Sequence, residues 1–141
     1  IDPRMETTPA GKLLTSKGGK VFIAAAAEYP TRRAALEAAG AEVWVLPDAA
    51  VPGRVDLREL MRELAKREVN EVHVEAGPRL SGALFAAGLI DEMLFYYAPC
   101  LFGAGMGPAA VPLPAEPGAA YRWSLQSLDQ IGGDFRVLLR R

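Results

Sequence analysis

Short unbroken apolar runs alternate with helical patterns along the first two thirds of the chain. The runs at Val21–Ala25, Glu42–Leu46 and Glu71–Val74 are typical of strands in a buried sheet. After them, apolar residues recur three and four positions apart, most clearly between Leu57 and Ala65. Because strands that alternate with helices form parallel sheets with crossover connections, this pattern predicts a parallel α/β sheet.

Capping residues predict where two of the helices begin and end. Thr31 is placed to cap a helix that runs to about Ala39, and Gly40 follows at the position where helices often end in glycine. Asp56, with Glu59 three residues later, forms a variant of the capping box. The Pro- and Gly-containing segment before Val21 predicts extended chain and loops.

The C-terminal third has a different pattern. A fourth strand is predicted at Glu92–Ala98, followed by a Gly- and Pro-rich loop over Pro99–Pro117. Two further strands, Arg122–Ile131 and Phe135–Arg140, are joined through Gly132-Gly133-Asp134, which is a strong hairpin signal. We therefore expect one domain over residues 1–141. Its mixed sheet is mostly parallel, with a C-terminal antiparallel hairpin and helices on both faces.

Composition excludes several classes of function. Half of the 141 residues are hydrophobic, 23% are charged and the formal net charge is −1, with no basic block. This balance disfavours binding to nucleic acids or anionic membranes. The lack of a secretory leader pattern, and of an apolar run near the roughly 18 residues that span a bilayer, predicts a cytoplasmic protein. A single cysteine, Cys100, excludes an internal disulfide and a cysteine-based zinc site, and we expect no metal.

The segment from Val74 to Ser81 carries the strongest functional signal. It predicts the end of a strand, a tight turn and the start of a helix, with Glu75 and Gly77 in the turn and Pro78 in the first helical turn. Free N–H groups at such a helix start bind phosphates, and a glycine lets a ligand approach the backbone. The alternative is that the turn only connects two elements.

An ordered string of motifs resembles the reductase domain of the bifunctional riboflavin biosynthesis deaminase-reductase. The string consists of Val74-Glu75-Ala76-Gly77-Pro78, Leu80-x-Gly82-Ala83-Leu84, Ala87-Gly88-Leu89-Ile90-Asp91-Glu92 and Ala98-Pro99-x-Leu101-x-Gly103. The resemblance implies a dihydrofolate-reductase-like fold and an NADPH-dependent reduction. It also implies that part of the reductase domain precedes Ile1, and that any deaminase domain lies outside this chain.

The same resemblance assigns roles to individual residues. It places Glu75 against the substrate and assigns the cofactor NADPH to Gly77, Pro78, Arg79, Leu80, Ser81, Gly82 and Ala83. The N–H groups of Arg79, Leu80 and Ser81 would meet the pyrophosphate, with the Ser81 hydroxyl as a further donor. Simpler roles stay open: Glu75 pairs with a Lys or Arg, Gly82 is a packing glycine, and Arg79 is solvated. No catalytic residue is assigned, and His73 is not expected to be one.

The function implied is reduction of 5-amino-6-(5-phosphoribosylamino)uracil to its 5-phosphoribitylamino product. Two alternatives remain: a non-catalytic fragment that binds a nucleotide or mediates dimerisation through its antiparallel strands, and a dihydrofolate-reductase relative that acts on a pterin. The partners expected are a small phosphorylated pyrimidine and a second copy of the chain in a homodimer, without nucleic acid or membrane.

Overall fold

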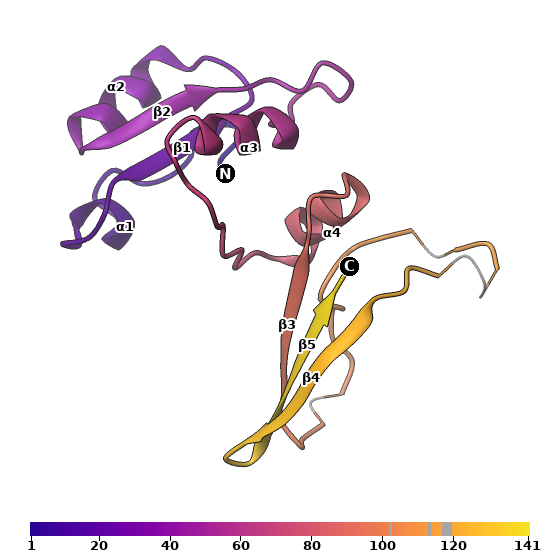
Figure 1. Ribbon diagram of the computed structural model, residues 1–141. Helices are drawn as coiled ribbons and strands as arrows, with labels where there is room; N and C mark the ends of the chain where they lie inside the picture. The colour runs from indigo at the N-terminus through magenta and orange to yellow at the C-terminus, as the bar shows by residue number, and fades with distance from the viewer. Residues whose placement is uncertain (102, 113, 117–119) are drawn as a thin grey trace. The chain divides into compact units, whose positions relative to one another are not determined.

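The computed structural model describes residues 1–101, 103–112, 114–116 and 120–141 (Figure 1). The chain divides into two compact units, Ile1–Val72 and His73–Arg141, and each is described by itself. The expectation of one domain stays a prediction. The elements are α1 (Lys12–Thr15), β1 (Val21–Ala25), α2 (Pro30–Ala38), β2 (Ala41–Val45), α3 (Leu57–Ala65), α4 (Pro78–Ala86), β3 (Glu92–Tyr97), β4 (Ser124–Ile131) and β5 (Asp134–Arg140).

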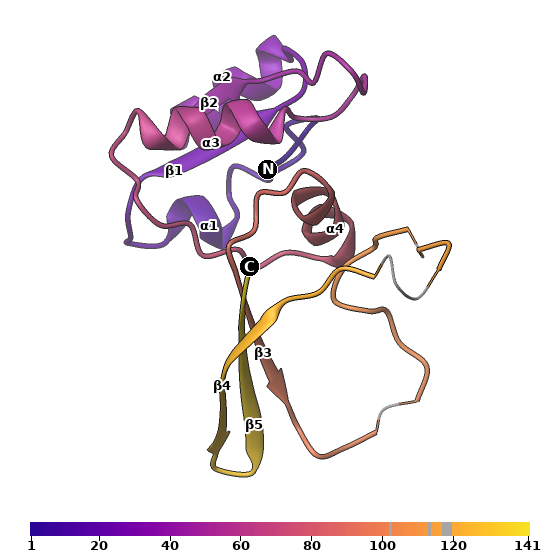
Figure 2. The same cartoon turned by 45° about the vertical axis from the view of Figure 1, so that its right-hand side comes forward.

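The first unit is a parallel strand pair covered by helices on both faces. β1 and β2 pair in register from Val21 opposite Ala41 to Ala25 opposite Val45. On one face Leu36 of α2 packs into a buried cluster of strand residues, and on the other Leu60 of α3 packs beside Trp44. Figure 2 shows α2 and α3 flanking the two strands. The expectation of helices on both faces is therefore confirmed in this unit.

Local signals predicted the helix ends well. The Asp56 carboxylate accepts hydrogen bonds from the backbone N–H groups of Arg58 and Glu59, both at 2.9 Å, so the predicted cap of α3 is confirmed. Gly40 follows α2 with φ of 94°, a left-handed conformation that glycine adopts without strain. The predicted cap at Thr31 is wrong: α2 begins at Pro30 with Tyr29 as its N-cap residue, and Thr31 lies inside the helix. The predicted loop before Val21 contains the single helical turn α1.

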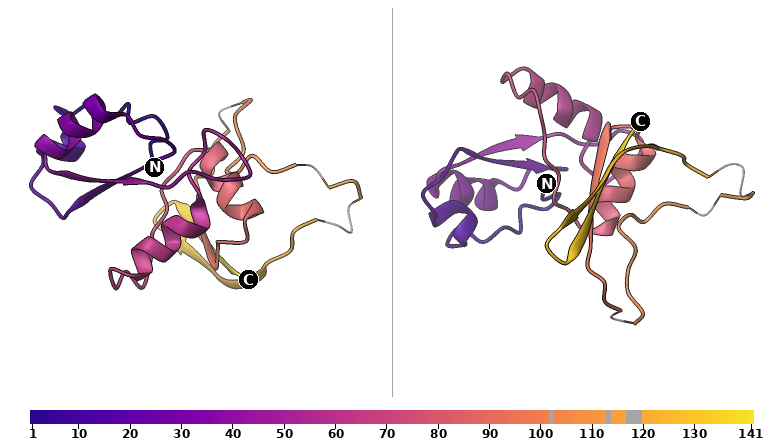
Figure 3. Two further views of the ribbon diagram at one scale, coloured as in Figure 1. Left: turned by 90° about the horizontal axis from the view of Figure 1, so that it is seen from above. Right: turned by 60° about the horizontal axis from the view of Figure 1, so that its bottom comes forward.

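The second unit contains an antiparallel sheet in the order β3-β5-β4. The predicted hairpin is confirmed: β4 and β5 meet at a two-residue turn of Gly132 and Gly133, in which Gly132 has φ of 62°. β4 begins at Ser124 rather than Arg122 and contains a register shift between Leu125 and Ser127. In Figure 3 the described part of the connection from β3 to β4 extends away from the three strands.

The two faces of this sheet differ sharply in polarity. Because successive strand residues point to opposite faces, the register places most of the large apolar side chains on one face, and Leu94, Tyr96, Ile131 and Leu138 on the other. We call it the apolar face; its members are Met93, Phe95, Tyr97, Leu125, Leu128, Phe135, Val137 and Leu139. The polar face carries two cross-strand ion pairs, Glu92 with Arg140 at 2.7 Å and Asp129 with Arg136 at 2.8 Å. Such alternation is typical of a sheet with one buried face.

The predicted strand at Glu71–Val74 is wrong. Residues 69–77 form neither helix nor strand, and no strand in the described part of the chain pairs with them. The side chains of Val72 and Val74 are 43% and 46% exposed. An apolar run becomes a strand only where another strand takes up its backbone hydrogen bonds. The α/β class with mixed strand directions is confirmed, and its parallel part, among the described residues, is the pair β1 and β2.

Candidate functional site

The start of α4 offers unused backbone donors. Gly77 is the N-cap residue, Pro78 occupies the first helical position, and no acidic side chain lies in the first turn. The N–H groups of Arg79 and Leu80 donate to no acceptor among the described residues. Two free donors at the positive end of a helix dipole form a site that attracts an anion.

Gly77 is open to solvent and to any ligand. A Cβ atom built on Gly77 has nothing within 4 Å among the described residues, and the φ of −71° is one that any residue adopts. Neither packing nor backbone conformation therefore requires glycine at this position. A bare backbone here leaves room for a bulky group to approach the N–H groups of Arg79 and Leu80.

Ser81 is used by the protein itself. Its N–H donates to the carbonyl oxygen of Gly77 at 3.1 Å, which is the first intrahelical bond of α4. Its hydroxyl donates to the carbonyl oxygen of Ala76 at 3.4 Å. Of the three backbone donors expected to meet a pyrophosphate, those of Arg79 and Leu80 remain free, and the hydroxyl must turn away from Ala76 to serve as a fourth.

Close packing explains why residue 82 is a glycine. It is buried, and a Cβ atom there would lie 2.3 Å from the carbonyl oxygen of Ala110. The same crossing segment donates a hydrogen bond from the Ala110 N–H to the Pro78 carbonyl at 2.8 Å. The glycine thus lets the chain pass directly over α4. The predicted contact of Gly82 with a cofactor stays a prediction, as do those of Pro78, Leu80 and Ala83, which are half-buried.

Glu75 lies just before this turn with an exposed carboxylate. Its side chain is 87% exposed, and Nε2 of His73 lies 3.6 Å from its Oε1. No Lys or Arg in the described part of the chain pairs with Glu75, so the structure gives no support to a structural ion pair there. Arg79 is also exposed and forms no ion pair with a described carboxylate. The exposed side chains of Glu75 and Arg79 therefore lie two residues before and two residues after Gly77 in the chain.

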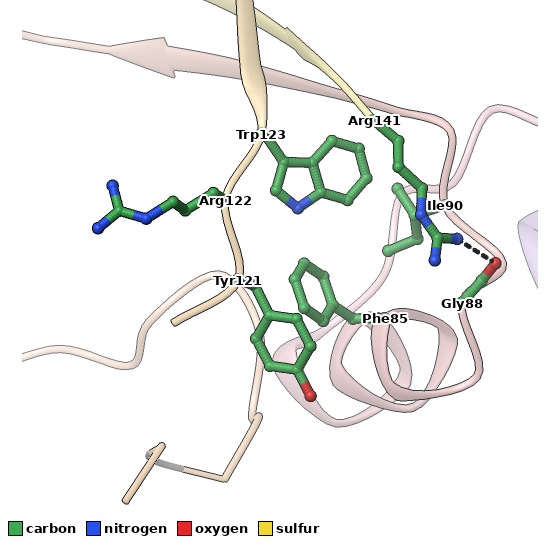
Figure 4. Close-up of a pocket in the computed structure, with 7 residues that line it drawn as sticks. All are labelled: Phe85, Gly88, Ile90, Tyr121, Arg122, Trp123 and Arg141. Carbon is green, nitrogen blue, oxygen red and sulfur yellow. Dashed lines mark hydrogen bonds between the residues drawn. The ribbon is translucent and has the colours of Figure 1, made fainter. Parts of the chain in front are cut away.

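A cavity elsewhere in this unit includes none of the predicted site residues. It measures about 240 Å³ and is lined by Phe85, Gly88, Ile90, Tyr121, Arg122, Trp123 and Arg141 (Figure 4). Phe85 meets Tyr121 edge-to-face at 4.6 Å, and the Arg141 guanidinium donates to the Gly88 carbonyl at 3.1 Å. These contacts hold the end of α4 against the segment that leads into β4, where the Trp123 ring also lies 5.9 Å from that of Phe85.

The described residues contain no group of three or more His, Cys, Asp or Glu side chains arranged to hold a metal ion. Each of their helices is too short or too polar to cross a membrane.

A sequence profile of the RibD C-terminal domain matches residues 1–137. The chain belongs to the RibD C-terminal domain family. The riboflavin biosynthesis protein RibD of Haemophilus influenzae is 45% identical over 82 residues, which is 57% of this chain and 22% of that protein. A protein of Buchnera aphidicola named 5-amino-6-(5-phosphoribosylamino)uracil reductase is 31% identical over 87 residues, covering 61% of this chain and 42% of that protein.

Solved RibD structures share the fold of this family member. Acinetobacter baumannii RibD superposes with a TM-score of 0.68 and 26% identity, over 85% of this chain and 30% of that one. The family resemblance inferred from the motif string around Glu75 and Gly77 is therefore confirmed. The chain spans less than half the length of these relatives.

Proposed function

We propose that this chain is the reductase part of riboflavin biosynthesis and reduces 5-amino-6-(5-phosphoribosylamino)uracil to the 5-phosphoribitylamino product with NADPH. The family match over residues 1–137 supports this, as does the Buchnera relative, which is named for that activity. The observation that carries the proposal is the open turn at Gly77, because it joins free N–H donors to an exposed carboxylate in one short segment.

The turn fits the pyrophosphate of a dinucleotide. Arg79 and Leu80 each present a free N–H group, Gly77 leaves the approach open, and the Arg79 side chain adds a positive charge. When bound, NADPH would supply a hydride to C1 of the open-chain ribosyl imine, and a proton from solvent would complete the reduction at the imine nitrogen. The chain's own part is to bind and orient, since hydride transfer depends on alignment of donor and acceptor.

Glu75 is proposed to hold the substrate. An exposed carboxylate that no described Lys or Arg pairs with can accept hydrogen bonds from ribose hydroxyls or from the N–H groups of a pyrimidine ring. Its place, immediately before the phosphate-binding turn, brings the substrate next to the cofactor. The residues of the chain thus have separate tasks, with Glu75 for the substrate and the first turn of α4 for the cofactor.

The test measures binding and turnover in the same 141-residue protein. NADPH and NADH are titrated by calorimetry, and turnover is followed as the loss of NADPH absorbance with the pyrimidine substrate present. We expect NADPH to bind with micromolar affinity. Glu75→Gln should raise the KM for the substrate by about 10-fold or more and change the Kd of NADPH by less than about twofold, because it removes a charge-assisted hydrogen bond from one ligand only.

Glu71→Gln is the matched control, since Glu71 is an exposed glutamate in the same connecting segment. It should leave both constants unchanged. Saturable NADPH binding without turnover would favour the non-catalytic nucleotide-binding alternative, and turnover that a folate analogue inhibits competitively would favour action on a pterin. A folded protein that binds no NADPH would overturn the cofactor site.

A further inference from the structure

The cavity of Figure 4 is walled by three aromatic rings and lies outside the proposed reductase site. The Phe85 ring meets Tyr121 edge-to-face with ring centroids 4.6 Å apart, and it lies 5.9 Å from the Trp123 ring in a tilted arrangement. Tyr121 is 59% exposed, and Phe85 and Trp123 are half-buried, so the rings are accessible to a ligand. Accessible aromatic side chains around a hollow are typical of a binding site for a small ring.

The charged side chains that line this cavity are both arginines, Arg122 and Arg141. Neither forms an ion pair with a carboxylate in the part of the chain that the structure describes. Arg141 is anchored twice: its Nη1 donates to the Gly88 carbonyl oxygen at 3.1 Å, and its backbone N–H donates to the Asp91 carbonyl oxygen at 3.2 Å. A guanidinium carries several N–H donors, so the remaining ones stay available to an acceptor in the cavity.

The end of α4 gives the Arg141 guanidinium a defined position. Gly88 has φ of 68°, a left-handed conformation that favours glycine, and a Cβ atom there would lie 3.4 Å from Nη1 of Arg141. The negative end of the helix dipole also stabilises a positive charge at this place. The cation is therefore fixed beside the rings before any ligand arrives.

Trp123 adds a neutral donor to the cavity. Its indole N–H donates to no acceptor among the described residues. In Figure 4 the indole nitrogen lies on the side of the ring that faces Phe85, whereas Arg122 extends away from the rings. The cavity thus combines aromatic surfaces, one neutral donor and one fixed cation, and no carboxylate is among the residues that line it.

We propose that this cavity binds a small planar aromatic ring that carries a carboxylate. The ring lies against Phe85 and Tyr121, and the carboxylate accepts from the Arg141 guanidinium and the Trp123 indole N–H. The volume of about 240 Å³ equals that of roughly eight water molecules at about 30 Å³ each, which suits one substituted six-membered ring and is too small for a dinucleotide. The inference is independent of the proposed reductase activity.

The experiment titrates the isotope-labelled protein with three probes of similar size and follows backbone and indole N–H signals by NMR. Benzoate has the ring and the charge, benzamide has the ring without the charge, and cyclohexanecarboxylate has the charge without the aromatic ring. Benzoate should shift the signals of Phe85–Ile90, Trp123 and Arg141 with a Kd of about 0.1 to 1 mM, as expected for so small a ligand. The other two probes should bind at least about 10-fold more weakly, because each lacks one of the two kinds of contact.

Two variants test the contacts separately. Arg141→Gln should weaken benzoate at least about 10-fold and leave benzamide unchanged, because it removes only the charge-assisted hydrogen bonds. Tyr121→Leu should weaken both aromatic probes by a similar factor. Arg54→Gln is the control for net charge, since Arg54 is an exposed arginine in a loop of the first unit. It should leave all three constants unchanged.

Several results would overturn the proposal. A folded protein that binds no benzoate at about 10 mM has no such site, since this concentration is about ten times the weakest Kd expected. Benzamide that binds as tightly as benzoate would show an apolar slot without anion recognition. Signal shifts scattered over the first unit, or wild-type benzoate affinity in Arg141→Gln, would place the binding elsewhere on the chain.

Discussion

A change of residue type at Gly77 should affect the binding of NADPH much more than it affects the fold. Its backbone has an ordinary negative φ, and added side-chain atoms meet nothing within 4 Å among the described residues. Aspartate and asparagine are good N-cap residues whose side chains accept from the N–H groups of the second and third helical residues, here Arg79 and Leu80. These are the donors proposed for the pyrophosphate.

Gly77→Asp should therefore weaken NADPH binding by at least about 100-fold, because its carboxylate both occupies the donors and repels the phosphates. Gly77→Asn should weaken it less, since it occupies the donors without a charge. Both should raise the free energy of unfolding by a few tenths of a kcal/mol relative to glycine. Calorimetric titration and urea unfolding measure the two effects. Gly18→Asp, in an open loop, is the control for the change in net charge. If Gly77→Asp bound NADPH with the affinity of the wild-type protein, the proposed phosphate site would be refuted.

At the scale of elements, α3 depends on its cap. Asp56 satisfies two backbone N–H groups that otherwise have no partner in the helix. Asp56→Ala should lower the free energy of unfolding by about 1 kcal/mol, measured by urea unfolding, and Asp56→Ser should retain most of it because serine also caps helices. Equal losses in the two variants would show that the cap hydrogen bonds contribute little.

The elements also show which signals the sequence carries. The caps at Asp56 and Gly40 and the turn at Gly132 act over two to four residues, and each was predictable. The glycine turn between β4 and β5 predicted the hairpin but not how widely the apolar face would be exposed. Gly82 had two possible roles in the sequence, and only the crossing of Ala110 over α4 shows that packing explains it.

At the scale of the whole molecule, hydrogen-bonded carboxylates connect stability to pH. Hydrogen bonds from Trp44 and Arg67 lower the pKa of Glu42, those from Lys66 and Arg67 lower the pKa of Glu63, and one from Arg136 lowers that of Asp129. A carboxylate whose pKa is lower in the folded state than in the unfolded state stabilises the fold above the unfolded value. This contribution is lost as the pH falls through the folded value.

We therefore expect the urea midpoint to stay level from pH 7 to about pH 5 and to fall below about pH 4.5. The groups are exposed, so salt should reduce the effect. Glu42→Gln should lower the midpoint at pH 7 and flatten its acid dependence, and a midpoint that rises on acidification would contradict the assignment. Fluorescence of Trp44, buried beside Arg67, is a direct probe of this unit.

The part of the candidate site that consists of neighbouring residues in the chain was predictable. The string from Glu75 to Ala83 indicated the family and the turn, because a helix start, a proline at its first position and a glycine before it are neighbours in the chain. The lack of a Lys or Arg partner for Glu75 among the described residues was not predictable, since such a partner can come from any distant segment. The hydrogen bond from the Ser81 hydroxyl to the Ala76 carbonyl was also missed, because it depends on how the serine side chain is rotated.

The sequence by itself determined the caps at Asp56 and Gly40, the hairpin turn, the α/β class and the family, since these depend on short-range spacing and on an ordered string of residues. Only the tertiary structure decided that Glu71–Val74 pairs with no strand among the described residues, that Ala110 crosses Gly82, and that the apolar face of the second sheet carries exposed leucines. Strand pairing and close packing join residues far apart in the chain. The free energy of these contacts depends on which distant residues make them, and no local pattern specifies those residues.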